Sequence, residues 1–201
     1  MKKGIFIIVA CFLTGCSILP EGNEPLPLYT LKNEDSTPAS SLPASLAIEL
    51  PKSEPSLDTH RIAVTFLPYS RDYLANGQWS DNLPNTLFEY FVENFSERWG
   101  GAVINRAEEG LQTSYTLYSN VHDFSLYLFP NGCADVRLKI NFRVIDFHNR
   151  RPIAGRTFSK KIQVNAYTMH GIMTAFNQGM GELLKETMLW IEDVVRNDKH
   201  S

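Results

Sequence analysis

Histidine and cysteine are the side chains in this sequence whose chemistry best suits metal binding or nucleophilic catalysis. The chain contains Cys11, Cys16 and Cys133, and its histidines are His60, His122, His148, His170 and His200. No two histidines lie three or four residues apart, the spacing that places two ligands on one face of a helix. Asp123, Asp135 and His122 could be assembled into a triad, but nothing in their spacing favours one. Phosphate-binding loops, dinucleotide fingerprints and nucleophile elbows do not occur either, so the sequence predicts no metal site, no cofactor and no enzyme activity.

The residues up to Cys16 indicate a different chemistry, the covalent attachment of lipid. Two lysines precede nine apolar residues, 5–13, a run too short for a membrane span of about 20 residues but typical of a signal peptide. The sequence then reads Leu-Thr-Gly-Cys, which resembles the lipobox of bacterial lipoproteins, where a peptidase cuts before the cysteine. We therefore expect residues 1–15 to be removed between Gly15 and Cys16, and the Cys16 thiolate to take up diacylglycerol. The resemblance implies further acylation, with palmitate among the chains; the alternative is an ordinary secretory signal that happens to contain a cysteine.

The residue after Cys16 bears on location. Ser17 stands where an aspartate commonly retains lipoproteins in the inner membrane. The resemblance to lipoproteins therefore implies an outer-membrane anchor with the protein facing the periplasm. Cys133 is then the cysteine left in an oxidising compartment, so no internal disulfide can form. It follows a Pro-Asn-Gly turn signal, and its role stays open between a small residue at a hairpin end, a reactive thiol and an intermolecular link.

Composition and the distribution of proline divide the chain. Its 201 residues are 43% hydrophobic and 20% charged, with a formal net charge of -3. These values are typical of one folded domain. The slightly negative net charge excludes an overall positive surface of the kind that binds nucleic acid. Residues 16–44 contain five prolines and many serines and are expected to form a tether, interrupted by a short edge strand at 26–31. Residues 45–198 are expected to form a single domain.

Apolar periodicity predicts the elements of that domain. Residues 82–99 and 168–195 show the spacing of amphipathic helices. Strands are predicted at 45–50, 61–66, 102–105, 114–128, 135–147 and 153–164, with a bulge near 121–124. Strict alternation from Val136 to Val144 indicates a sheet with one buried face. We therefore predict an α+β fold of two layers, in which a largely antiparallel sheet of four to six strands carries two amphipathic helices on one face.

Two sets of residues are candidate binding surfaces. The stretch 67–81 is predicted to be a loop, and its aromatic and basic residues suit a partner-binding surface: Tyr69, Arg71, Tyr73 and Trp79. Alternatively, Tyr73 and Trp79 fold back to plug the core. Eight basic residues and one acidic residue occur between positions 137 and 161, so Arg137, Lys139 and Arg143 could form a basic face for an anionic partner or phospholipid headgroups. A solvated outer sheet face is the plainer interpretation.

Three short stretches resemble the ABC-type transport auxiliary lipoprotein component family. They are residues 28–31 (LYTL), residues 55–64 (PSLDTHRIAV), and a pattern made by Tyr73, Gly77, Trp79, Leu83 and Pro84. The family includes lipoproteins encoded with MCE-domain (mammalian cell entry) lipid transport systems, such as the paraquat-inducible system. The resemblance implies a non-enzymatic periplasmic subunit that works with an ABC permease and ATPase and an MCE protein to move phospholipid between the inner and outer membranes. It leaves homo-oligomer formation open.

The sequence leaves two alternatives to this transport role. One is an outer-membrane assembly or secretion-accessory lipoprotein of the pilotin or chaperone type, which a gene neighbourhood holding an ATPase, a permease and an MCE gene would argue against. The other is a periplasmic hydrolase, which would need a nucleophile that the sequence does not reveal.

Overall fold

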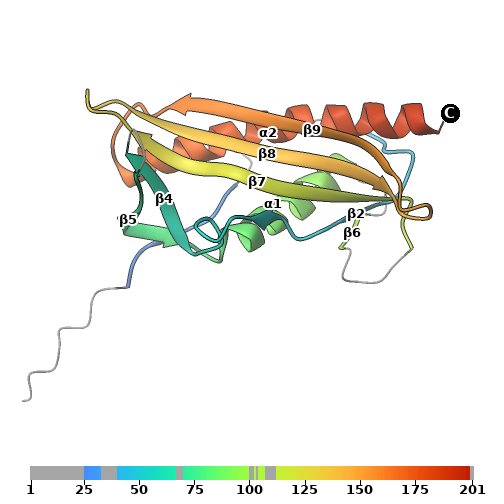
Figure 1. The fold of residues 1–201 in the computed structure, drawn as a ribbon, viewed down its shortest axis with the longest axis horizontal. Coiled ribbons are helices and arrows are strands. Elements are labelled where there is room, and N and C mark those ends of the chain that lie inside the picture. Colours follow the sequence, from blue (N-terminus) through green and yellow to red (C-terminus); the bar gives the residue numbers. More distant parts are fainter. Residues whose placement is uncertain are drawn as a thin grey trace, which may run out of the picture.

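The computed structural model describes residues 25–32, 40–66, 70–99, 102, 104–106 and 112–199. The predicted signal peptide, Cys16 and Tyr69 lie outside these residues. The described chain forms one nine-stranded sheet and two helices (Figure 1). The strands are β1 (Leu28–Tyr29), β2 (Leu46–Ile48), β3 (Lys52–Ser53), β4 (Arg61–Phe66), β5 (Ser70–Trp79), β6 (Ile104–Arg106), β7 (Tyr115–Leu128), β8 (Ala134–Asp146) and β9 (Pro152–Gln163). The helices are α1 (Leu83–Arg98) and α2 (Met169–Asp198).

Strand β7 organises the sheet. It pairs in parallel with β2, β3 and β4, and antiparallel with β8. The pairs β1–β5 and β2–β6 are also parallel, so the sheet is mixed. The prediction of a largely antiparallel sheet of four to six strands is therefore wrong. Several of the added strands have only two or three residues, too few to show an alternating pattern, and parallel pairing joins segments that are distant in sequence.

The predicted loop at 67–81 is also wrong over most of its length, because residues 70–79 form strand β5. This strand makes an antiparallel hairpin with β4, with a register shift between Arg61 and Ala63. Most of its side chains are exposed or half-buried, so the strand lacks the apolar alternation that would reveal it. The stretch 26–31, for which the sequence indicates an edge strand, contains β1, which lies at the end of the sheet beside β5.

The long antiparallel strands agree with the sequence. β7, β8 and β9 form a meander, and the expected bulge in β7 is confirmed by a register shift between Val121 and Asp123. In β8 the even-numbered side chains from Val136 to Val144 are buried, and the alternating arginines, lysine and asparagine lie on the opposite face.

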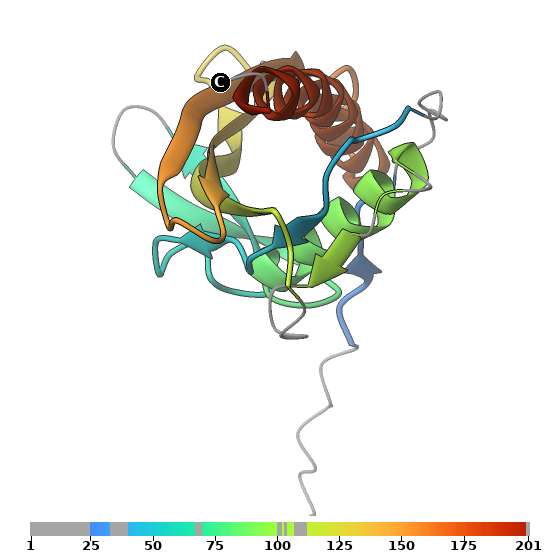
Figure 2. The same ribbon diagram turned by 90° about the vertical axis from the view of Figure 1, so that its right-hand side faces the viewer.

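Both helices lie against this buried face of β8. Seen end on, the sheet curves round one side of the molecule and the helices run along the other (Figure 2). The Phe142 ring of β8 lies 5.5 Å from Phe91 of α1, and the position of Gly179 in α2 lies against Leu138. Aromatic rings from both layers thus fill the core. Thr168 caps α2 by accepting a hydrogen bond from the Gly171 N–H, and neither helix is long and apolar enough to cross a membrane.

Candidate functional site

Strand β5 holds three of the four residues that the sequence singles out as a partner-binding surface: Arg71, Tyr73 and Trp79. Arg71 forms an ion pair with Glu54 and donates to the Ser56 hydroxyl. The Tyr73 hydroxyl donates to the Ser56 carbonyl at 3.2 Å, and the Arg61 guanidinium stacks 3.9 Å from the centre of the Tyr73 ring. Through these bonds Arg71 and Tyr73 hold the segment before β4 against β5. Parts of both side chains remain exposed to solvent.

Trp79, the third of these residues, is a core residue. Only 1% of its surface is exposed, and its ring packs edge-on against Phe124 at 5.7 Å and Phe176 at 5.3 Å. Of the two alternatives that the sequence leaves open for Trp79, the structure shows the one in which the ring folds back into the core. Its side chain therefore offers no surface for contact with a partner.

The odd-numbered side chains of β8 form the outer face of the sheet, and Arg137, Lys139 and Arg143 lie on it together. Lys161 of β9 lies opposite Arg137 in the ladder, which extends this set; we call these four residues the basic face. Asp135 partly neutralises the positive charge of the basic face, because its carboxylate lies 3.0 Å from the Lys161 amine and 3.8 Å from the Arg137 guanidinium. Lys139, Arg143 and Lys161 are exposed, and of these three Lys161 is the one that pairs with Asp135.

Not all the basic residues between 137 and 161 share this face. Lys160 and Arg156 alternate to the other side of β9, toward α2. There the Lys160 amine lies 2.6 Å from Glu186 and 3.8 Å from Glu182. The single patch suggested by the sequence is thus divided between two faces, because side chains alternate along a strand.

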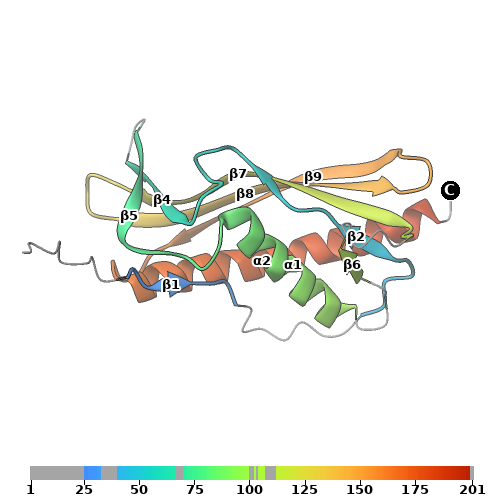
Figure 3. The same cartoon turned by 90° about the horizontal axis from the view of Figure 1, so that it is seen from below.

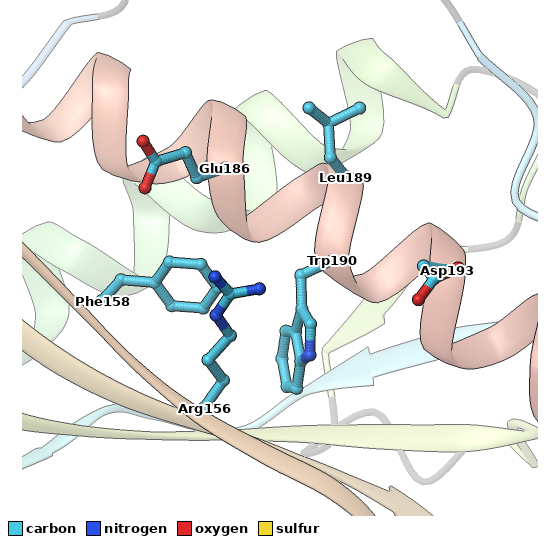
Figure 4. Close-up of a pocket in the computed structure, with 6 residues that line it drawn as sticks. All are labelled: Arg156, Phe158, Glu186, Leu189, Trp190 and Asp193. Atoms are coloured by element: carbon cyan, nitrogen blue, oxygen red, sulfur yellow. The ribbon is translucent and has the colours of Figure 1, made fainter.

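A groove of about 310 Å³ lies between β9 and α2 (Figure 4). Phe158 and Trp190 form its aromatic walls, with ring centres 5.8 Å apart, and the Arg156 guanidinium lies 5.0 Å from the centre of the Phe158 ring. Glu186, Leu189 and Asp193 of α2 complete the lining. Mixed charge beside aromatic rings suits contact with a polypeptide.

Sequence reasoning missed a buried ion pair that joins the two helices. Glu192 of α2 accepts a hydrogen bond from the Trp99 indole at 2.9 Å and pairs with the Arg98 guanidinium at 3.1 Å. Burial raises the pKa of the Glu192 carboxyl, but the Trp99 hydrogen bond and the Arg98 charge outweigh burial and hold this pKa below its ordinary value. The partners lie 93 and 94 residues away, so no local pattern could have revealed them.

The site is therefore a set of surfaces suited to binding. Within the described parts of the chain, no group of three or more histidine, cysteine, aspartate or glutamate residues is placed to hold a metal ion. Cys133 is exposed and carries no disulfide. The positions of Arg71, Tyr73 and the basic face follow from strands β5, β8 and β9, and these side chains can bind or orient a partner.

Comparisons with known proteins agree with the fold and point to a family. Residues 29–187 match the family model described as ABC-type transport auxiliary lipoprotein component. A crystal structure from Xanthomonas campestris, described under the family model DUF330, is similar with a TM-score of 0.74 and 18% identity, over 88% of this chain and 98% of that one. A hypothetical protein from Chlamydia trachomatis is similar with a TM-score of 0.51 and 11% identity, over 75% of this chain and 97% of that one. No curated protein matches the sequence.

Proposed function

Because this chain belongs to the family of ABC-type transport auxiliary lipoprotein components, we propose that it is the non-catalytic periplasmic subunit of an MCE-type ABC transport system that moves phospholipid between the inner and outer membranes. The observation that carries the proposal is the family match, which runs from β1 into α2 and so covers nearly the whole described domain. The partners in this proposal are the MCE-domain protein and the ABC permease and ATPase.

The N-terminal sequence supports the cellular location in this proposal. Cys16, with its lipid, anchors the chain to the outer membrane, and Ser17 at the next position favours outer-membrane sorting. Several acyl chains hold a protein firmly at a bilayer, because each buried methylene contributes about 0.8 kcal/mol. The domain then lies in the periplasm, where it can contact the parts of such a transporter that extend out of the membrane.

We place the contact with the transporter on the exposed part of the basic face. Lys139 and Arg143 project from the rigid meander β7–β8–β9, and neither takes part in the core. A fixed pair of cations on a sheet suits an acidic protein surface, and such charges mainly speed and orient association. Arg71 and Tyr73 on β5 are the second contact region in this proposal.

Affinity purification from detergent-solubilised envelopes tests the proposal. The full lipoprotein carrying an affinity tag should co-purify the MCE protein, the permease and the ATPase. The double variant Lys139→Glu/Arg143→Glu should lose most of this co-purification while its unfolding midpoint stays unchanged, because both side chains are exposed. The matched control is Lys185→Glu on the exposed side of α2, which should retain the partners.

Two outcomes would contradict different parts of the proposal. Recovery of an outer-membrane assembly or secretion complex in place of transporter subunits would contradict the proposed function and favour the accessory-lipoprotein alternative. Full retention of the transporter by the double variant would leave the proposed function standing and contradict only the basic face as the contact.

A further inference from the structure

A second, more apolar cavity lies at one end of the molecule, away from the groove and the basic face. It has a volume of about 410 Å³. Its walls come from the end of β4, the turn between β7 and β8, and the approach to α2, and they include Phe66, Leu128, Phe129, Pro130, Cys133 and Tyr167. None of these side chains carries a charge. The cavity therefore differs in character from the groove of Figure 4, which is lined by an arginine and two acids.

The aromatic residues at the mouth of this cavity are unusually open to solvent. Phe66 is 43% exposed and Tyr167 is 60% exposed. Both stand at the ends of elements, where their rings make no contribution to the aromatic core. Clustered exposed apolar side chains of this kind mark a surface that binds a membrane, another protein or a ligand.

The N-terminal segment of the described chain lies at the same end. In Figures 1 and 3, strand β1, the β7–β8 turn and the start of α2 all lie toward one end of the long axis, and the β8–β9 turn and the C-terminus lie at the other. Close packing agrees with the views, because a side chain at Gly77 would meet both Tyr29 of β1 and Met169 at the start of α2. Leu28 in β1 is itself 61% exposed.

The length of chain before β1 limits how far this end can lie from a lipid anchor. Pro25, where the described chain begins, lies nine positions after Cys16. Fully extended, nine residues reach at most about 30 Å. A lipid on Cys16 therefore keeps Pro25, three residues before β1, within about the thickness of one bilayer from the membrane surface.

We propose that this apolar end docks into the interface of the bilayer that holds the lipid anchor, with Phe66 and Tyr167 inserted at the depth of the headgroups. The proposal rests on lipidation of Cys16, which is part of the proposed function. Tyrosine and phenylalanine suit this position because an aromatic ring is apolar while the tyrosine hydroxyl stays hydrated. The long axis of the domain then points away from the membrane, and the β8–β9 turn and the C-terminus face the periplasm.

The chain provides its own probe for this proposal. After removal of residues 1–15 and lipidation of Cys16, Cys133 is the remaining thiol, and it is exposed on the wall of the cavity. A nitroxide attached to Cys133 of the lipidated protein, reconstituted in vesicles of phosphatidylethanolamine and phosphatidylglycerol, reports its depth by electron paramagnetic resonance. Molecular oxygen concentrates in the bilayer and a nickel chelate stays in water. We expect the label to be relaxed several-fold more by oxygen than by the chelate.

A matched probe at the far end is the control. In the Cys133→Ser background, His148→Cys places the label in the exposed β8–β9 turn, where the nickel chelate should dominate. Equal, chelate-dominated relaxation at the two positions in vesicles that still carry the protein overturns the docking proposal and leaves the lipid anchor intact. Low accessibility to both relaxers at position 133 means that protein covers this end, and it overturns the proposal as well.

A double substitution separates insertion from mere proximity. Phe66→Ser/Tyr167→Ser removes the two exposed rings without disturbing buried contacts. The label at Cys133 should then shift toward the chelate-accessible behaviour of position 148, while flotation with the vesicles persists through the lipid. An unchanged oxygen preference in this variant overturns the assignment of the two rings. Failure of the wild-type protein to float at all would instead show that the lipid anchor is missing.

Discussion

The indole of Trp79 connects three elements that are distant in sequence. Its ring lies between Phe124 of β7 and Phe176 of α2, and its backbone N–H donates to the His60 carbonyl at the start of β4. Neighbouring backbone groups bind β1, since the Gln78 N–H donates to the Pro27 carbonyl and the Ser80 N–H to the Tyr29 carbonyl. The three stretches that resemble the family therefore lie close to one another around this indole. This arrangement indicates that these residues stabilise the fold.

Replacing this side chain tests its structural role. We expect Trp79→Ala to lower the free energy of unfolding by about 3 to 5 kcal/mol, because it leaves a cavity among aromatic rings. Urea denaturation followed by circular dichroism measures the change. Arg71→Ala serves as the comparison, and loss of its exposed ion pair should cost less than about 1 kcal/mol. Equal effects of the two substitutions would contradict the core position of Trp79.

Glu192 makes stability depend on pH. The pKa of its carboxyl is held below the ordinary value in the folded protein, so the charged form contributes stability above the unfolded pKa, and this contribution is lost as the pH falls through the lowered folded pKa. We expect Glu192→Gln to cost about 2 to 3 kcal/mol at pH 7, because the buried Arg98 loses a charged partner. The difference from wild type should shrink below about pH 4.

Denaturation curves at several pH values measure this difference. Glu186→Gln is the matched control, since Glu186 is exposed and pairs with Lys160 at the surface. A Glu192→Gln effect that stays constant down to pH 2 would show that the charge of Glu192 is not the source of the stability.

At the scale of elements, α2 approaches the sheet closely at Gly179. A Cβ atom there would lie 2.8 Å from Leu138 Cδ1 and 3.1 Å from Ile162 Cγ1. Glycine costs a helix about 1 kcal/mol relative to alanine, and here it leaves room for these two side chains. We expect Gly179→Val to destabilise the protein by about 1 to 3 kcal/mol through overpacking.

A double-mutant cycle assigns the cause of that loss. In a Leu138→Ala background the space at Gly179 is larger, so Gly179→Val should be less harmful than in the wild type. Thermal unfolding of the four proteins gives the coupling. Additive effects would mean that Gly179 and Leu138 do not compete for space.

The sequence could predict the elements that carry a clear period. Both helices and the strands β7, β8 and β9 are long enough to show alternating or helical spacing, and even the bulge at Val121 is visible as a change of face. The parallel pairings of β2, β3 and β4 with β7 leave no local signal, because they depend on contacts across 60 residues or more.

The candidate site was predictable to a smaller degree. The shared face of Arg137, Lys139 and Arg143 follows from alternation within one strand. Trp79 could not be assigned, since a tryptophan in an apparent loop serves a core or a surface equally well, and only the packing of β7 and α2 decides. The groove between β9 and α2 depends on how two distant elements meet, so its lining had no signature in sequence.

At the scale of the whole molecule, the proposed function makes Cys16 the residue that fixes the domain to a membrane. We expect Cys16→Ala to leave an unlipidated, uncleaved precursor, because without the thiol no diacylglycerol is attached. Metabolic labelling with a fatty-acid analogue, followed by membrane fractionation, measures this. Labelling that persists in the variant would refute the lipoprotein assignment.

The central position of β7 has a consequence for the order in which the chain can fold. β2, β3, β4 and β8 all pair with β7, and three of these partners precede it by more than 50 residues. The first hundred residues are therefore synthesised before the strand with which they pair. Folding is expected to be slow, because the chain must lose the entropy of closing these long loops before strand pairing stabilises them. Until residue 128 is available, the earlier strands lack the partner that completes the sheet, so their apolar side chains stay exposed and prone to aggregation.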